Sequence, residues 1–179
     1  MQQRCRSALF HPHRPARQRG VYALEWAIIF PVFFMLLYGI ICYGLTFLVR
    51  ESMQFAVEEG ARAALRYPVG KDTATWADRK QQAQDAVIQS LDWLPAAIRP
   101  TASTVQFTAC AVSNTSCSPQ TALDSGLLCN AQSPCMVLVS YTIDNYAEHA
   151  IAPALPGFGL ILPSSLQATA SMVIDRELL

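Results

Sequence analysis

The chain has 179 residues, with 13 basic and 13 acidic side chains and a formal net charge of +0 at pH 7. Because the net charge is zero, the overall charge gives no reason to expect a partner such as nucleic acid. The length allows one modest domain beside a membrane segment. The distribution of the charges is more informative, because five arginines precede Gly20 and a single charged residue, Glu25, lies between Gly20 and Val49.

The first feature in chain order is a basic tip, residues 1–20, followed by an apolar segment of 29 residues from Val21 to Val49. A helix needs about 20 residues to cross a hydrocarbon core of about 30 Å, so we expect a membrane helix that projects beyond the bilayer. A buried helix of a soluble protein is the alternative, but such helices are rarely apolar on every face. Because Lys and Arg are enriched on the cytoplasmic side, the N-terminus is expected in the cytoplasm and the residues after Arg50 outside.

Glu25 is the most informative residue, because an ionisable side chain within a membrane span is costly and by default indicates a function. Cleavage after Gly20 would create an amine on Val21, one helical turn before Glu25 or opposite Glu25 of a neighbouring subunit. The positive end of the helix dipole also favours a carboxylate there. The alternative interpretation is a glutamate that extends to the cytoplasmic interface without a partner.

The run RGVYALEW, residues 19–26, resembles the site cut by prepilin peptidase: a glycine after a basic leader, four residues, a glutamate and an aromatic residue. The usual aromatic is tyrosine or phenylalanine, and here it is Trp26. The similarity continues through Pro31, through AVEEGARAALRYP and, weakly, in SLQATASMVIDREL near the C-terminus. In these segments the chain resembles the TadE-like minor pseudopilins of the Tad (Flp-type) pilus.

This resemblance implies a structural protein for pilus assembly in the bacterial inner membrane, with no enzymatic activity and no cofactor. Prepilin peptidase would cut between Gly20 and Val21. The mature protein would act with a TadF-like partner pseudopilin and the pilus assembly platform, with its C-terminal domain in the periplasm. Two alternatives stay open: a minor pseudopilin of a type II secretion or type IV pilus system, and an uncleaved, signal-anchored envelope protein whose disulfide-bonded domain binds an extracellular ligand.

The helix that starts at residue 21 is expected to continue to about residue 66, with a kink at Pro31, which lacks a backbone N–H. Glu58 and Arg62 are predicted to form an i,i+4 ion pair, and Pro68 and Gly70 are expected to end the helix. Apolar and small residues recur at helical spacing in one stripe: Met53, Val57, Gly60, Ala61 and Ala64. The stripe predicts close packing against the protein's own domain, with a partner pseudopilin as the alternative.

Residues 67–179 are expected to form a small periplasmic α+β domain, with one helix and an antiparallel sheet of about three strands. Thr75 with Asp78 predicts a helix start, and apolar residues then recur at helical spacing from Trp76 to Leu94. Strands are predicted where apolar residues alternate with other residues: 105–109, 137–143 and 166–174.

Four cysteines fall in a loop, residues 110–135, that is expected outside the cytoplasm: Cys110, Cys117, Cys129 and Cys135. Their number predicts two disulfides, with free buried thiols as the alternative. Their spacing is unlike that of zinc ligands, so no metal is expected. Three pairings are possible, and a hairpin with Cys110 and Cys135 at its mouth favours the nested set, Cys110–Cys135 with Cys117–Cys129.

Catalytic motifs are absent from the sequence, which contains no P-loop, nucleophile elbow or H-E-x-x-H. Asp144, Glu148 and His149 form the one acid–histidine cluster outside the basic tip, and we interpret them as a solvated loop. No catalytic residue is therefore predicted.

Overall fold

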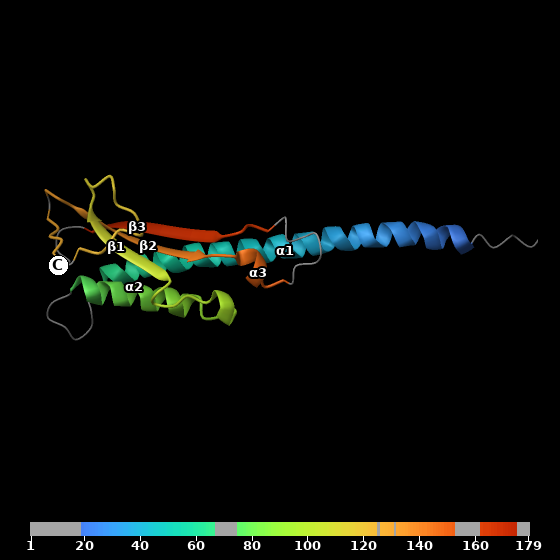
Figure 1. Cartoon of the computed structure of the whole chain (residues 1–179), viewed down its shortest axis with the longest axis horizontal. Coiled ribbons are helices and arrows are strands. Elements are labelled where there is room, and N and C mark those ends of the chain that lie inside the picture. Colours follow the sequence, from blue (N-terminus) through green and yellow to red (C-terminus); the bar gives the residue numbers. More distant parts are fainter. Residues whose placement is uncertain (1–18, 67–74, 125, 131, 153–161, 175–179) are drawn as a thin grey trace, which may run out of the picture. The chain divides into compact units, whose positions relative to one another are not determined.

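The structure is a computed structural model that describes residues 19–66, 75–124, 126–130, 132–152 and 162–174. Contacts divide the chain into two units, Met1–Tyr38 and Gly39–Leu179, which we name the N-terminal and the C-terminal unit. The elements in chain order (Figure 1) are α1 (Arg19–Leu65), α2 (Trp76–Ser90), η1 (Ala96–Ile98), β1 (Val105–Ala111), β2 (Cys135–Ile143), α3 (Tyr146–His149) and β3 (Leu166–Ile174).

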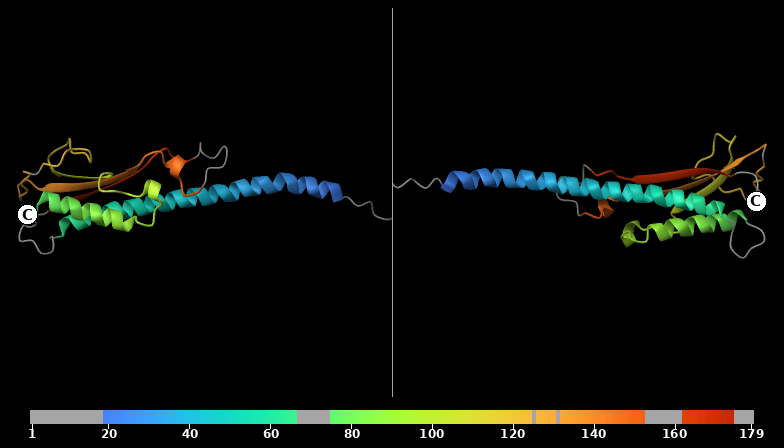
Figure 2. Two further views of the ribbon diagram at one scale, coloured as in Figure 1. Left: turned by 60° about the horizontal axis from the view of Figure 1, so that its bottom comes forward. Right: turned by 180° about the vertical axis from the view of Figure 1, so that it is seen from behind.

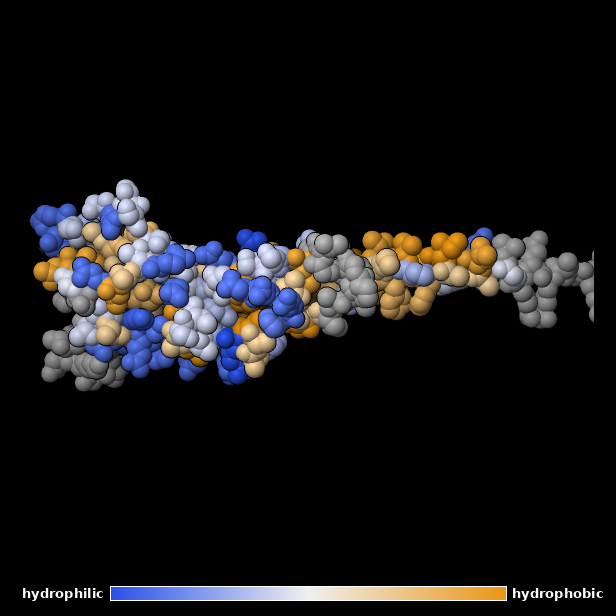
Figure 3. Space-filling model, in the orientation of Figure 1, coloured by the Kyte–Doolittle hydropathy of each residue, from blue (hydrophilic) through white to orange (hydrophobic). Residues whose placement is uncertain are grey.

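The described part of the N-terminal unit is helical and belongs to α1, which has 47 residues and continues through Pro31. Large hydrophobic side chains from Tyr22 to Leu37 are between 41% and 67% exposed. In Figure 3 the face of this helix that is in view is mostly orange, which marks hydrophobic residues. Among the described residues, α1 is the one helix long and apolar enough to cross a membrane. The long apolar helix is confirmed, and the kink at Pro31 stays a prediction.

A three-stranded antiparallel sheet in the order β1-β2-β3 forms one layer of the C-terminal unit. Val139 of the central strand lies opposite Phe107 of β1 on one side and Ala170 of β3 on the other. The buried face of the sheet shares one hydrophobic core with α1 and α2. In Figure 1, β3 is seen above and α2 below the C-terminal part of α1, and the left panel of Figure 2 shows β3 above both helices. The predicted α+β class and the three predicted strands are confirmed.

The small-residue stripe of α1 is buried within its own domain, and four of its members are 0% exposed: Met53, Val57, Ala61 and Ala64. The fifth member, Gly60, marks the closest approach. A Cβ added at Gly60 would lie 2.6 Å from Val87 Cγ2 and 3.0 Å from the Ala83 carbonyl oxygen, both on α2. It would also lie 3.6 Å from Val139 Cγ1 of β2. The absence of a side chain at residue 60 therefore lets α2 approach α1 this closely, as the stripe predicted.

The start of α2 follows the predicted capping box. Thr75 Oγ1 accepts a hydrogen bond from the Asp78 N–H at 3.2 Å, and the Asp78 carboxylate accepts one from the Thr75 N–H at 3.1 Å. Arg79, one residue later, is 0% exposed and donates from Nη1 to the Ala64 carbonyl oxygen at 2.7 Å. A cation at a helix C-terminus satisfies a carbonyl that lacks a helical partner and favours the helix dipole. Arg79 therefore joins the first turn of α2 to the last turn of α1.

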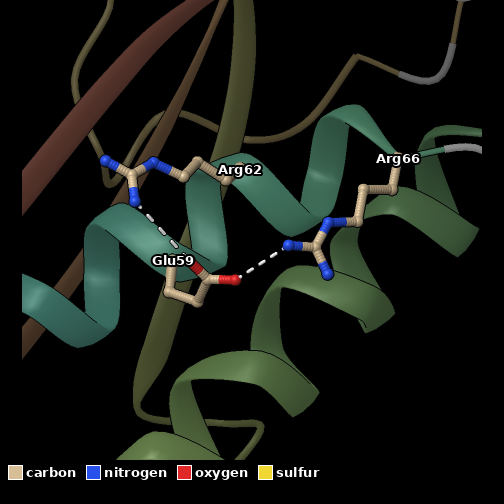
Figure 4. Close-up of polar contacts among 3 residues, drawn as sticks. All are labelled: Glu59, Arg62 and Arg66. Carbon is tan, nitrogen blue, oxygen red and sulfur yellow. Dashed lines mark hydrogen bonds and ion pairs between the residues drawn. The ribbon is translucent and has the colours of Figure 1, made fainter.

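The predicted ion pair between Glu58 and Arg62 is wrong. Arg62 Nη1 lies 3.7 Å from a carboxylate oxygen of Glu59, which also accepts a hydrogen bond from Arg66 Nη2 at 3.0 Å (Figure 4). Glu58 instead accepts a hydrogen bond from Gln54 Nε2 at 3.1 Å. Glu59 lies within reach of Arg62, one turn further on the helix, and of Arg66, just beyond the last residue of α1, so its carboxylate contacts both.

The two predicted disulfides are present, but the nested pairing is wrong, because the bonds are Cys110–Cys117 and Cys129–Cys135. The strand register explains the correction. Cys110 lies opposite Met136, whereas Cys135 lies opposite Ala111. Neighbouring residues of a strand point to opposite faces of a sheet, so Cys110 and Cys135 cannot approach each other. Each therefore pairs with a cysteine of the loop.

The loop between β1 and β2 is held to the rest of its unit by more than these bonds. Trp76 at the start of α2 donates from Nε1 to the Leu127 carbonyl oxygen at 3.0 Å. Leu123, Leu127 and Cys129 also pack against the core. The loop is thus fastened at both strand ends and to α2.

Tyr141 of β2 connects the sheet to η1, the short helix that follows α2. Its side chain is 3% exposed, and its hydroxyl donates to the Ile98 carbonyl oxygen at 2.6 Å. Burial raises the pKa of Tyr141 from 10.0 to about 12, because the phenolate is poorly solvated there.

We expect Gly60→Ala to lower the free energy of unfolding of the full-length protein in detergent by about 1–3 kcal/mol. The added methyl would collide with α2, and this cost outweighs the gain of about 1 kcal/mol in helix propensity. Chemical denaturation followed by circular dichroism measures the change. Gly44→Ala is the matched control, because a Cβ at Gly44 meets nothing within 4 Å; equal stability of the two variants would contradict the close approach.

The variant Tyr141→Phe tests how much the buried hydroxyl contributes to stability at pH 7 and between pH 10 and pH 12. At pH 7 the free energy of unfolding should fall by about 1–2 kcal/mol, because the Ile98 carbonyl loses its donor. In the wild type, stability should fall between pH 10 and pH 12, since tyrosine in the unfolded chain releases its proton while buried Tyr141 keeps it. The variant should lack the part of this alkaline loss of stability that comes from Tyr141. Urea titrations at pH 7 and between pH 10 and pH 12 measure the free energy of unfolding, with exposed Tyr43→Phe as the control.

Candidate functional site

The bond expected to be cut, between Gly20 and Val21, lies in the first turn of α1, which begins at Arg19. Gly20 is exposed, and a Cβ built there would meet nothing within 4 Å. The first N–H groups of a helix lack intrahelical partners, and glycine is about 1 kcal/mol less favourable than alanine in a helix, so this turn unwinds at little cost. The chain therefore presents the bond at an accessible helix end.

Glu25 and Trp26 follow within the next turn and a half, and both are exposed on the helix. Within the described residues, no side chain forms an ion pair or a hydrogen bond with Glu25. Glu25 lies four residues after Val21, a rise of about 6 Å that places both on the same side of a helix. An amine at Val21 would therefore lie within reach of the Glu25 carboxylate of its own chain or of an adjacent one.

Pro31 interrupts the hydrogen bonding of α1 without ending the helix. A proline at this position cannot donate to the carbonyl four residues earlier, which belongs to Ala27. Aromatic rings flank the proline, with the centroids of Phe30 and Phe34 4.9 Å apart. The Ala27 carbonyl thus lacks its helical donor, and the aromatic rings are exposed. A neighbouring helix can supply contacts to both.

The expected exposure of the acid–histidine cluster is confirmed, but the expected loop is wrong in part, because Glu148 and His149 belong to the short helix α3. Asp144, Glu148 and His149 all have exposed side chains, at and beside the short helix α3. Among the residues that the structure describes, no three histidine, cysteine, aspartate or glutamate side chains gather as a set that could hold a metal ion.

One feature of the C-terminal unit was missed by the sequence reasoning. A cavity of about 500 Å³ lies between α1 and the segment that enters β3, and it is lined by Tyr43, Thr46, Phe47, Arg50, Leu162, Pro163, Ser165, Leu166 and Gln167. Its α1 residues recur at steps of three and four, so they share one face of the helix. That spacing was visible in the sequence, but the segment opposite it was not.

The family model described as TadE-like protein matches residues 20–62. The match covers the expected cleavage motif from Gly20 onward, the apolar segment, and the small-residue stripe of α1 as far as Ala61. The resemblance found in the sequence is thus confirmed for this region, and it supports a protein related to the Tad pilus. No curated protein and no solved structure gives a significant match to the chain.

Proposed function

We propose, from the TadE-like character of residues 20–62, that this chain is a minor pseudopilin that supports assembly of a Tad pilus. Residues 1–20 are the leader, residues 21–66 the membrane and stalk helix, and residues 67–179 the periplasmic domain. The helix anchors the protein by a single pass in the bacterial inner membrane, with its N-terminus in the cytoplasm. Prepilin peptidase removes the leader between Gly20 and Val21.

The observation that carries this proposal is the unpaired carboxylate of Glu25 at the start of an apolar helix. The next 24 residues, Trp26 to Val49, contain no charge. A carboxylate close to the low-dielectric interior of a membrane is stabilised when a cation pairs with it. Within the described residues, no cation pairs with Glu25. Cleavage after Gly20 supplies such a cation as the amine of Val21.

The surface of α1 supports a role in assembly rather than an isolated anchor. Its apolar side chains up to Leu37 are exposed on all sides, so lipid or neighbouring helices must cover them. We infer that a TadF-like partner pseudopilin and the assembly platform contact this surface. The two disulfides of the outer domain suit the oxidising periplasm.

Gly20→Asp should prevent maturation in the native host, because a charged side chain would stand at the bond that the peptidase attacks. Intact mass of the membrane-extracted protein should show Val21 as the first residue of the wild type and Met1 as the first residue of the variant. Ala16→Asp adds the same charge within the leader, and it should leave cleavage unchanged. A wild-type protein that retains Met1 would indicate an uncleaved, signal-anchored envelope protein instead.

Glu25→Gln should leave cleavage intact but lower the number of pili by about tenfold or more, because the new amine of Val21 loses its charged partner near the membrane. Electron microscopy of the pili and intact mass of the protein measure the two effects separately. Glu51→Gln removes an exposed carboxylate of the same helix beyond the apolar segment, and it should have no effect. Normal pili in Glu25→Gln cells would contradict the charge pairing.

A further inference from the structure

The cavity beside α1 combines an apolar lining with several hydrogen-bond donors. Phe47, Leu162 and Leu166 supply apolar surface, and Arg50 is the one cation among the described lining residues. None of these described residues is acidic. The cavity therefore has a net positive charge and an apolar lining, a combination that fits an amphipathic anion.

All but one of the side-chain donors that line this cavity have no acceptor within the described residues. The Arg50 guanidinium, the hydroxyls of Tyr43 and Ser165 and the Gln167 amide form no hydrogen bond or ion pair there, whereas Thr46 Oγ1 already donates to the Cys42 carbonyl oxygen at 2.9 Å. One turn away from Arg50 on the same helix face lie Thr46 and Gln54, neither of which is acidic. Two other exposed arginines differ in this respect, because Arg62 of α1 and Arg66 just after α1 both contact Glu59.

The position of Arg50 along the helix identifies the kind of anion. The uncharged run from Trp26 to Val49 has 24 residues, a length of about 36 Å in a helix. The hydrocarbon core is about 30 Å thick, and the headgroup layers bring the bilayer to about 40–45 Å. With Glu25 at the inner edge, Arg50 lies within the outer headgroup layer, where phosphodiester groups are the most abundant anions.

We propose that this cavity binds the phosphodiester headgroup of an outer-leaflet phospholipid. The Arg50 guanidinium pairs with the phosphate oxygens in the forked geometry that arginine favours. Tyr43, Ser165 and Gln167 supply further donors, and an acyl chain lies against Phe47 and Leu162. The lipid thereby joins α1 to the segment that leads into β3. This inference rests on the membrane anchoring in the proposed function, but not on cleavage at Gly20.

Native mass spectrometry of the full-length protein in detergent, titrated with short-chain phosphatidylglycerol, tests the proposal. We expect one lipid adduct on the wild type and an affinity reduced about tenfold or more in Arg50→Gln, which lacks the charged donor. Arg62→Gln is the matched control, because it removes an arginine from the same helix about 18 Å further along, and it should bind as the wild type does. Gln167→Trp keeps the charge but fills the cavity, and it should also weaken binding.

Three outcomes would overturn the lipid site. These are equal affinity of wild type and Arg50→Gln, an equal loss in Arg62→Gln, and the same Arg50-dependent binding of inorganic phosphate, which would assign the cavity to a free anion. Extraction of membranes at alkaline pH separates failure of the anchor from failure of the site. Release of the wild type would refute the membrane helix, whereas a retained protein without a lipid adduct would refute only the headgroup site.

Discussion

The packing of α1 against α2 and β2 depends on one helix face that lacks large side chains. At Gly60 the neighbours stand so close that a single methyl would collide with both a side chain and a backbone oxygen of α2. Alanines at positions 56, 61 and 64 continue this face, and all are fully buried. Because the side chains there are small, the backbone of α2 approaches α1 closely, and the sheet packs against the same segment of α1. The core of the C-terminal unit is arranged around this approach.

Polar groups near the two ends of α1 differ in whether they have a partner within the described residues. At its C-terminal end the Ala64 carbonyl accepts a hydrogen bond from a fully buried arginine of α2, Arg79, so a polar group that the helix leaves open is satisfied inside the protein. Toward its N-terminal end, Glu25 has no partner within the described residues. A buried structural contact and an exposed unpaired charge are thus found on one helix. We infer that the first serves the fold and that the second serves association with other chains.

The charges along α1 also fix the depth at which the helix can lie in a bilayer. Glu25 and Arg50 bound a run with no charged side chain, slightly longer than a hydrocarbon core is thick. A helix with such bounds cannot slide far in either direction without burying a charge. In the proposed membrane-anchored protein, the cavity at Arg50 would therefore stay at one level of the bilayer, a condition for recognising a headgroup by position as well as by charge.

The sequence by itself determined α1, α2, the three strands and the class of the fold, because each depends on local periodicity and local hydrogen bonding. The capping box at Thr75 and the small-residue stripe are of this kind, and so is the expected cleavage motif around Gly20, which is recognised from adjacent residues alone. The short helix α3 was expected as a loop. The tertiary structure decided which residues meet. Sequence counts gave two disulfides but not their pairing, because the pairing depends on whether Cys110 and Cys135 face the same side of the sheet, and a register shifted by one residue reverses that. The cavity at Arg50 needed both α1 and the chain entering β3, more than 110 residues apart, and no local pattern brings such distant segments together.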